Sequence, residues 1–154
     1  MTAEPAATAK AAQGTGLAEA LAGLAHHVLH LFADAGRGHK LSQQQVELIC
    51  AVIVKGTTGM TELGSVLHVE KSSLSNLVDR LEQRGLVVRT RDPRDRRATH
   101  VSLTDEGTTI AIQTYDDVIT RLRSQLDQLP PADQRHLAAV ARELTRAGQP
   151  LPSR

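Results

Sequence analysis

The chain has 154 residues, which suits one domain, and its formal net charge of +1 at pH 7 by itself says nothing about a nucleic-acid partner. Hydrophobic residues make up 40% of it, enough for a core, although Phe32 and Tyr115 are its only aromatic residues. No apolar run reaches the roughly 20 residues of a membrane-spanning helix, and no secretory signal pattern is present. The single cysteine, Cys50, cannot form an intrachain disulfide. We therefore expect a cytoplasmic protein with no membrane partner.

The N-terminal third predicts a tail and then a helix. Residues 1–16 are rich in Ala, Thr and Gly without an apolar period, so we expect a disordered tail there. Over about 17–35, apolar residues recur at steps of three and four, which predicts one face of a helix. The residues of this stripe are Leu17, Leu21, Leu24, Val28 and Leu31.

Two further helices are predicted before residue 68. Ser42 followed by Gln45 has the spacing of a capping box, so a helix should begin there and end before Gly56. A short helix should cover about 61–67, with Thr61 as its cap.

A fourth helix and a β-hairpin come next. The helix is expected over about 71–84, with Gly85 placed where a C-terminal glycine cap belongs. The β-rich runs 86–88 and 100–103 surround an arginine-rich loop and predict a hairpin.

The C-terminal third predicts two helices. A long helix should begin at Thr104 with acidic residues in its first turn, and Pro130-Pro131 should break the chain before a last helix. The fold class is therefore mainly α with a small β-hairpin. We expect residues 148–154 to form a C-terminal tail.

Residues 60–79, MTELGSVLHVEKSSLSNLVD, match the pattern of a helix-turn-helix. The fifth position must be small so that the two helices can approach, and here it is Gly64. Five further positions should face a shared core, and all five are apolar: Leu63, Leu67, Val69, Leu74 and Leu77. The ninth position, often glycine, is His68, a residue that tolerates left-handed geometry.

The second helix of such a motif, here the recognition helix, enters the major groove with its N-terminal end. At about 100° per residue, Ser72, Asn76, Asp79 and Gln83 point outward, and Ser73, Ser75 and Arg80 flank them. Asn76 is the candidate for a base contact, to adenine, whereas Asp79 would repel phosphate. The phosphate candidates are Lys71, Ser72, Ser73 and Arg80.

The hairpin loop concentrates positive charge. The stretch Arg89–Arg97 holds five arginines against two aspartates. From charge alone, this is either an electrostatic footprint for a polyanion or a solvated loop. A hairpin directly after a helix-turn-helix makes a winged helix over about 42–104. The DNA candidates at the wing tip are Arg94, Asp95, Arg96 and Arg97, because arginine suits narrow minor grooves. On an extended segment Asp95 would share a side with Arg97 and hold its guanidinium.

Residues 72–107, SSLSNLVDRLEQRGLVVRTRDPRDRRATHVSLTDEG, resemble the multiple antibiotic resistance regulator (MarR) family of winged-helix repressors. The typical wing, D-x-x-D-R-R followed by an alternating strand and L-T-x-x-G, is present as Asp92, Asp95, Arg96, Arg97, Leu103, Thr104 and Gly107. The helix order extends the resemblance over residues 17–147, as a single domain. It implies a homodimer whose first, fifth and sixth helices intertwine, so that residues 17–35 and 105–147 serve in dimerisation. It also implies that the two wings of the dimer bind a pseudo-palindromic operator. The long apolar stripes independently favour a twofold dimer.

The resemblance also implies a signal that moves the two DNA-binding lobes, and three kinds remain open. A small organic ligand is one, although so few aromatic residues argue against an aromatic-lined pocket. Oxidation of Cys50 is the second, but its apolar face favours a structural thiol, so no redox site is assigned. A metal such as Zn²⁺ is the third, because His26 and His30 lie at i and i+4 on one helix face, with His27 and His39 nearby.

Two function classes compete with a DNA-binding regulator. The motifs of common enzyme classes are absent from the sequence, so we do not expect catalysis. A winged helix that binds only proteins is the stronger alternative. DNA binding should weaken steeply with salt, and binding to a protein partner need not.

Overall fold

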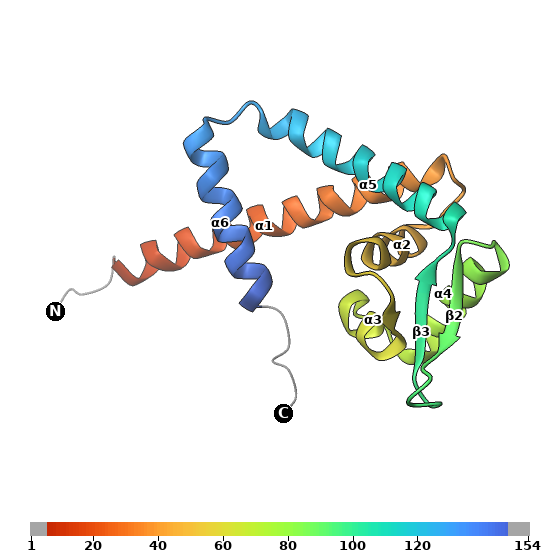
Figure 1. Cartoon of the computed structure of the whole chain (residues 1–154). Helices are drawn as coiled ribbons and strands as arrows, with labels where there is room; N and C mark the ends of the chain where they lie inside the picture. The colour runs from red at the N-terminus through yellow and green to blue at the C-terminus, as the bar shows by residue number, and fades with distance from the viewer. Residues whose placement is uncertain (1–5, 148–154) are drawn as a thin grey trace. The chain divides into compact units, whose positions relative to one another are not determined.

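The computed structural model describes residues 6–147, with side chains from residue 16 to residue 146, and within that range it is mainly helical with one small sheet (Figure 1). The predicted fold class is therefore confirmed. The chain divides into two compact units, Met1–Val118 and Ile119–Arg154. The elements are α1 (Ala6–Arg37), α2 (Gln43–Lys55), β1 (Thr58–Gly59), α3 (Met60–Leu67), α4 (Lys71–Gln83), β2 (Val87–Arg91), β3 (Thr99–Leu103), α5 (Asp105–Leu126) and α6 (Pro131–Ala147).

Helix α1 begins at Ala6, whereas the sequence predicted a disordered tail up to residue 16 and a helix from residue 17. Alanine is the strongest helix former, so an alanine-rich stretch can extend a helix without carrying an apolar period of its own. The remaining part of the predicted tail, residues 1–5, and the predicted C-terminal tail, residues 148–154, lie outside the described residues.

Local capping signals set the ends of α2 as predicted. Ser42 Oγ accepts a hydrogen bond from the backbone N–H of Gln45 at 3.3 Å, and Gln45 Oε1 accepts one from the backbone N–H of Ser42 at 2.9 Å. This reciprocal pair is a capping box. The helix then ends at Lys55, and Gly56 follows it with φ 80°.

The start of α3 differs from the prediction that Thr61 caps it. The cap residue is Gly59, which has no side chain to bond the helix. Gly59 belongs to β1, a two-residue strand that pairs with β3 through Thr58↔Val101 and Gly59↔His100. Because this pairing fixes the backbone up to Gly59, the helix begins at the next residue, ahead of Thr61.

The predicted hairpin is present and forms two strands of a three-stranded antiparallel sheet in the order β1-β3-β2. Its register runs from Val87↔Leu103 to Arg91↔Thr99, which leaves residues 92–98 as the connecting loop. Figure 1 shows α2, α3 and α4 gathered around this hairpin, with the loop protruding at its far end. We call residues 87–103 the wing.

The helix-turn-helix core forms as the sequence pattern predicts. Leu63, Leu74 and Leu77 are buried, while Leu67 and Val69 are partly buried against the same core. A Cβ on Gly64 would lie 3.2 Å from the carbonyl oxygen of Val69, so the small residue permits the close approach. His68 ends α3 in the left-handed conformation, with φ 53° and ψ 40°.

A second close approach joins the wing to α5. A Cβ on Gly107 would lie 1.9 Å from the carbonyl oxygen of Leu86, so only glycine fits. The same carbonyl accepts the backbone N–H of Thr104 at 3.1 Å. Thr104 Oγ1 accepts the backbone N–H of Gly107 at 3.0 Å and donates to the carbonyl of Gly85 at 2.6 Å. The L-T-x-x-G motif therefore fixes the end of the wing against the first turn of α5.

Several helices expose apolar side chains. On α1, Leu17, Leu21 and Leu24 are 63%, 41% and 54% exposed. Among the described side chains of the second unit, the exposed large apolar residues are Leu126, Leu137, Val140 and Leu144. Within the described residues, no helix is both long enough and apolar enough to cross a membrane.

Candidate nucleic-acid interface

The recognition helix α4 is amphipathic in the sense that the sequence predicted. It buries Leu74, Leu77, Val78 and Leu81. The opposite side exposes Lys71, Ser72, Ser73, Asn76 and Arg80, while Ser75 and Asp79 are half-buried. Its first turn has backbone N–H groups without an acceptor in the helix, a general property of helix starts that suits phosphate oxygens. The proposed DNA-contacting side chains thus share one accessible surface.

The wing loop is held by two carboxylates that bond its backbone. Asp92 Oδ1 accepts the backbone N–H of Arg94 at 2.7 Å and that of Asp95 at 3.3 Å. These hydrogen bonds lower the pKa of Asp92 below its ordinary value. Asp95 Oδ1 in turn accepts the backbone N–H of Arg97 at 2.9 Å. The spacing D-x-x-D therefore closes a rigid turn.

The predicted contact between Asp95 and the guanidinium of Arg97 does not form. Residues 92–98 turn back on themselves, as the hydrogen bond between the backbone N–H of Asp92 and the carbonyl of Ala98 shows, so the two side chains do not lie along an extended segment. Arg94, Arg96 and Arg97 are exposed, and none of them forms an ion pair with another described residue. Their charge is available to a partner.

Arg89, counted above in the positive charge of the loop, is used inside the protein. Its Nη1 lies 2.5 Å from Asp79 Oδ1 and 2.8 Å from Glu82 Oε2, both on α4. Its Nη2 donates to the carbonyl of Ser75 at 3.0 Å. Asp79, which the sequence alone set against phosphate binding, is therefore neutralised by a guanidinium. The free positive charge of the wing is correspondingly smaller than the sequence count.

The far end of α4 is attached to the turn that follows α1. Arg84 Nη1 donates to the carbonyl of Lys40, and Nη2 donates to the carbonyl of His39, each at 2.8 Å. Lys40 has a left-handed backbone with φ 54°. Sequence reasoning missed this contact, because it joins residues more than forty positions apart.

Comparison with known proteins identifies the family. A sequence model described as the MarR family matches residues 41–99. The chain is 24% identical to the HTH-type transcriptional regulator YkoM of Bacillus subtilis over 74% of this chain and 73% of that protein. It is 30% identical to the multiple antibiotic resistance protein MarR of Escherichia coli, over 61% of this chain and 65% of that protein. Residues 41–99 of this chain therefore match a MarR-family domain.

Solved structures agree on the fold. The structure of the MarR family transcription regulator SP03579 matches with a TM-score of 0.78 and 18% identity, over 92% of this chain and 94% of that one. NadR in complex with 4-hydroxyphenylacetate matches with a TM-score of 0.72 and 24% identity, over 81% and 89%. The MarR family consists of DNA-binding transcriptional regulators, so the winged helix of this chain is a DNA-binding unit.

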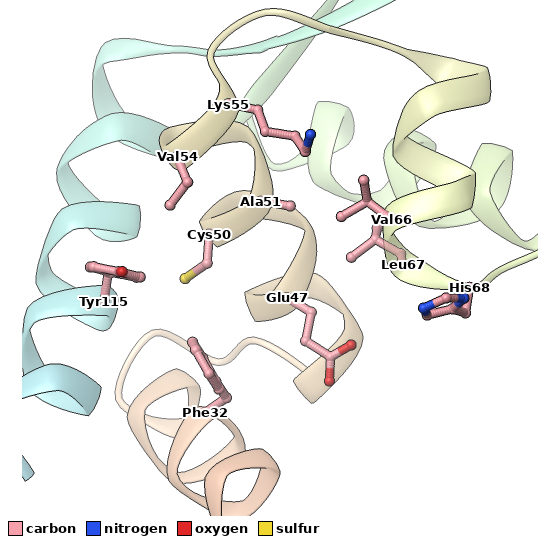
Figure 2. A pocket seen from close by; sticks show the side chains of 10 residues that line it. All are labelled: Phe32, Glu47, Cys50, Ala51, Val54, Lys55, Val66, Leu67, His68 and Tyr115. Atoms are coloured by element: carbon pink, nitrogen blue, oxygen red, sulfur yellow. The ribbon is translucent and has the colours of Figure 1, made fainter. Parts of the chain in front are cut away.

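A pocket of about 390 Å³ lies within the first unit. It is lined by Phe32, Glu47, Cys50, Ala51, Val54, Lys55, Val66, Leu67, His68 and Tyr115. Its lining includes both aromatic residues of the chain, so the low aromatic content was a poor argument against an aromatic pocket. Figure 2 shows Phe32, Tyr115 and the sulfur of Cys50 facing one another across it.

Cys50 is 6% exposed, as predicted for a structural thiol. Burial raises the pKa of Cys50 to about 11. A thiol with so high a pKa is almost wholly protonated near neutral pH, which makes it a poor nucleophile. No redox role follows from its position beside the pocket.

The histidine pair predicted on α1 is present. Nε2 of His26 and Nε2 of His30 lie 2.9 Å apart, with ring centroids at 4.4 Å, on an exposed face. Among the described residues no group of three or more His, Cys, Asp or Glu side chains could hold a metal ion. Metal binding at His26 and His30 stays a prediction.

Proposed function

We propose that the chain is a homodimeric repressor that binds a pseudo-palindromic operator through α4 and the wing of each subunit. The observation that carries this proposal is the hydrogen-bonded wing turn, which exposes Arg94, Arg96 and Arg97 without an ion pair to any described residue. A related structure, that of a mutant of MarR from Escherichia coli, contains operator DNA, and a curated relative is named the transcriptional repressor MdtR.

The two surfaces have different roles in this proposal. Asn76 on α4 contacts a base, adenine in the most favourable geometry, because an amide donates and accepts at once. Lys71, Ser72, Ser73, Ser75 and Arg80 contact phosphates and set the register. The wing arginines reach the adjoining minor groove, where negative potential is concentrated. Asp95 acts on DNA through the backbone of the turn.

Dimerisation accounts for the exposed apolar side chains. The leucines exposed on α1 and those on α6 are ordinary interface residues but are unusual on a monomer's surface. A twofold dimer would bury them and would place two recognition helices about one DNA turn, roughly 34 Å, apart. Sedimentation at micromolar concentration tests this, and a monomer would contradict it.

The DNA-binding proposal is tested by fluorescence anisotropy on a duplex that the wild-type protein selects from a random-sequence pool. We expect log affinity to fall linearly with log salt concentration. Arg97→Ala should lower affinity without unfolding the protein, whereas Arg135→Ala on α6 is the matched control. Asn76→Ala should relax preference at one base position by about 1–3 kcal/mol. Failure to bind any duplex would favour the alternative of a winged helix that binds only proteins, and salt-independent binding would contradict the proposed phosphate contacts.

We propose that the effector is a small organic molecule with an aromatic ring, bound in the pocket between Phe32 and Tyr115. The relatives that support this class are NadR in complex with 4-hydroxyphenylacetate and BpsR, whose DNA binding is regulated by 6-hydroxynicotinic acid. Thermal shifts with these two compounds as probes provide a first assay. Ala51→Leu, which fills the pocket, should abolish a shift that Ala139→Leu on α6 preserves.

A metal effector is the second candidate, favoured by the 2.9 Å separation of the two Nε2 atoms of His26 and His30. Two imidazoles at i and i+4 on a helix suit Zn²⁺, which would complete its tetrahedral shell with other ligands. Elemental analysis of protein purified without an affinity tag tests this. His26→Ala should remove the metal and His136→Ala should not. A metal-free protein that also fails to bind added Zn²⁺ would exclude this candidate.

A further inference from the structure

Arg89 lies on the wing strand β2, two residues before Arg91, in a sequence that reads as part of the basic DNA-binding loop. Its side chain is only 23% exposed, whereas the wing-tip arginines are exposed. All the partners of its guanidinium are on α4. This arginine therefore differs from its neighbours in both burial and partners.

The contacts of Arg89 form one connected set. Glu82 uses both carboxylate oxygens: Oε1 accepts the backbone N–H of Arg89 at 3.1 Å, and Oε2 accepts Nη1 at 2.8 Å. The same Nη1 reaches Asp79, and Nη2 reaches the carbonyl of Ser75. Ser75, Asp79 and Glu82 are spaced at i, i+4 and i+7, so the contacts follow one stripe of the recognition helix.

We propose that Arg89 is a positioning residue for DNA binding: it fixes the wing against α4 and neutralises Asp79 and Glu82 beside the phosphate backbone, and it does not itself contact phosphate. This inference rests on the proposed function, since it assigns a role within the operator-binding surface. Arginine suits the role, because its planar fork donates to three acceptors at once, which the ammonium group of lysine cannot match in geometry.

The charges explain why the role matters. Asp79 and Glu82 are 49% and 40% exposed, so without Arg89 two carboxylates would face a partner that is itself strongly negative. At a few ångströms, two unit charges interact by about 1 kcal/mol even in bulk water, which corresponds to roughly fivefold in affinity. Loss of Arg89 should therefore weaken DNA binding through the carboxylates that remain.

A double-mutant cycle tests this dependence. Affinity for a duplex selected by the wild-type protein is measured for Arg89→Gln in the natural background and in one that carries Asp79→Asn and Glu82→Gln. We expect a loss of about fivefold to tenfold in the first background and less than about twofold in the second. Equal losses in both backgrounds, or no loss in either, would overturn the inference.

Arg91→Gln is the matched control, since Arg91 lies on the same strand, is exposed and has no ion pair with another described residue. Its effect on affinity should be the same in both backgrounds. Arg89→Lys separates charge from geometry: it should restore part of the affinity lost in Arg89→Gln, because it returns the charge without the three-way contact. Circular dichroism establishes that each variant folds.

If the protein selects no duplex, that result counts against the proposed function and not against the contacts of Arg89. A measurement on the free protein then tests these contacts. In arginine side-chain NMR spectra, the hydrogen-bonded Nη groups of Arg89 should give separate signals because their rotation is restricted. Those of Arg91 should average. Averaged Nη signals for Arg89 in the wild-type protein would overturn the inference. Separate signals in the wild-type protein that become averaged in the Asp79→Asn, Glu82→Gln variant would support it.

Discussion

Replacing Gly107 by alanine tests the close packing of the first turn of α5 against the backbone of Leu86, just before the wing. The new Cβ would lie 1.9 Å from the carbonyl oxygen of Leu86 and 2.8 Å from its carbonyl carbon, against backbone that has little freedom to move. The atoms must separate by more than an ångström to reach ordinary contact. That displacement would strain the hydrogen bond from the backbone N–H of Thr104 to the same carbonyl.

The expected cost follows from three contributions. Overpacking costs about 1–3 kcal/mol, and loss of the hydrogen bond adds about 1 kcal/mol. Alanine's preference for helix over glycine offsets up to about 1 kcal/mol. We therefore expect Gly107→Ala to lower the free energy of unfolding by about 1–3 kcal/mol, which lowers Tm by about 2–12 °C in a chain of this size.

Urea unfolding at a fixed protein concentration measures this change, since the stability of a dimer depends on concentration. Gly23→Ala on α1 is the control, because a Cβ there has nothing within 4 Å. It should stabilise the protein by up to about 1 kcal/mol. If Gly107→Ala were as stable as Gly23→Ala, the close approach to Leu86 would not exist in solution.

Three further variants test local features. His68→Gly should raise the free energy of unfolding by about 1 kcal/mol in urea, because glycine takes the left-handed conformation without cost; a destabilised variant would contradict this. Ser42→Ala should cost about 1 kcal/mol by the same measurement, through loss of the capping box of α2, and an unchanged midpoint would refute it. Folding raises the pKa of Cys50 from 9.0 to about 11, so its contribution to stability is complete below pH 9 and is lost as pH rises toward 11. Cys50→Ala should reduce that alkaline loss in a series of unfolding curves, and identical pH profiles would exclude burial as the cause.

The features that the sequence predicted well are those encoded by neighbouring residues. The capping box of α2 needs only Ser42 and Gln45, and the helix-turn-helix pattern lies within twenty consecutive residues. The left-handed conformation of His68 could be predicted because the turn of the helix-turn-helix needs such a residue at this position, whatever the rest of the fold. Binary pattern and turn chemistry agree in these segments, so local reasoning was sufficient.

The features that were missed depend on how separate helices and strands pack against one another. The strand β1 has two residues, and only its pairing with β3 makes it a strand. The charge count included Arg89 in the footprint for a polyanion, because the sequence does not show that β2 packs beside α4 and brings Arg89 to Asp79 and Glu82. Likewise, Phe32 and Tyr115 are too far apart in sequence to indicate that they line one pocket.

The bond between Arg84 and the turn after α1 has a consequence for regulation. Its two hydrogen bonds attach Arg84, the residue that follows α4, to the backbone carbonyls of His39 and Lys40, in the turn that follows α1. Because both acceptors are backbone carbonyls, they cannot move by a change of side-chain rotamer and move only with the main chain. In the proposed dimer, a shift of α1 would therefore act on the C-terminal end of α4 directly through these two hydrogen bonds.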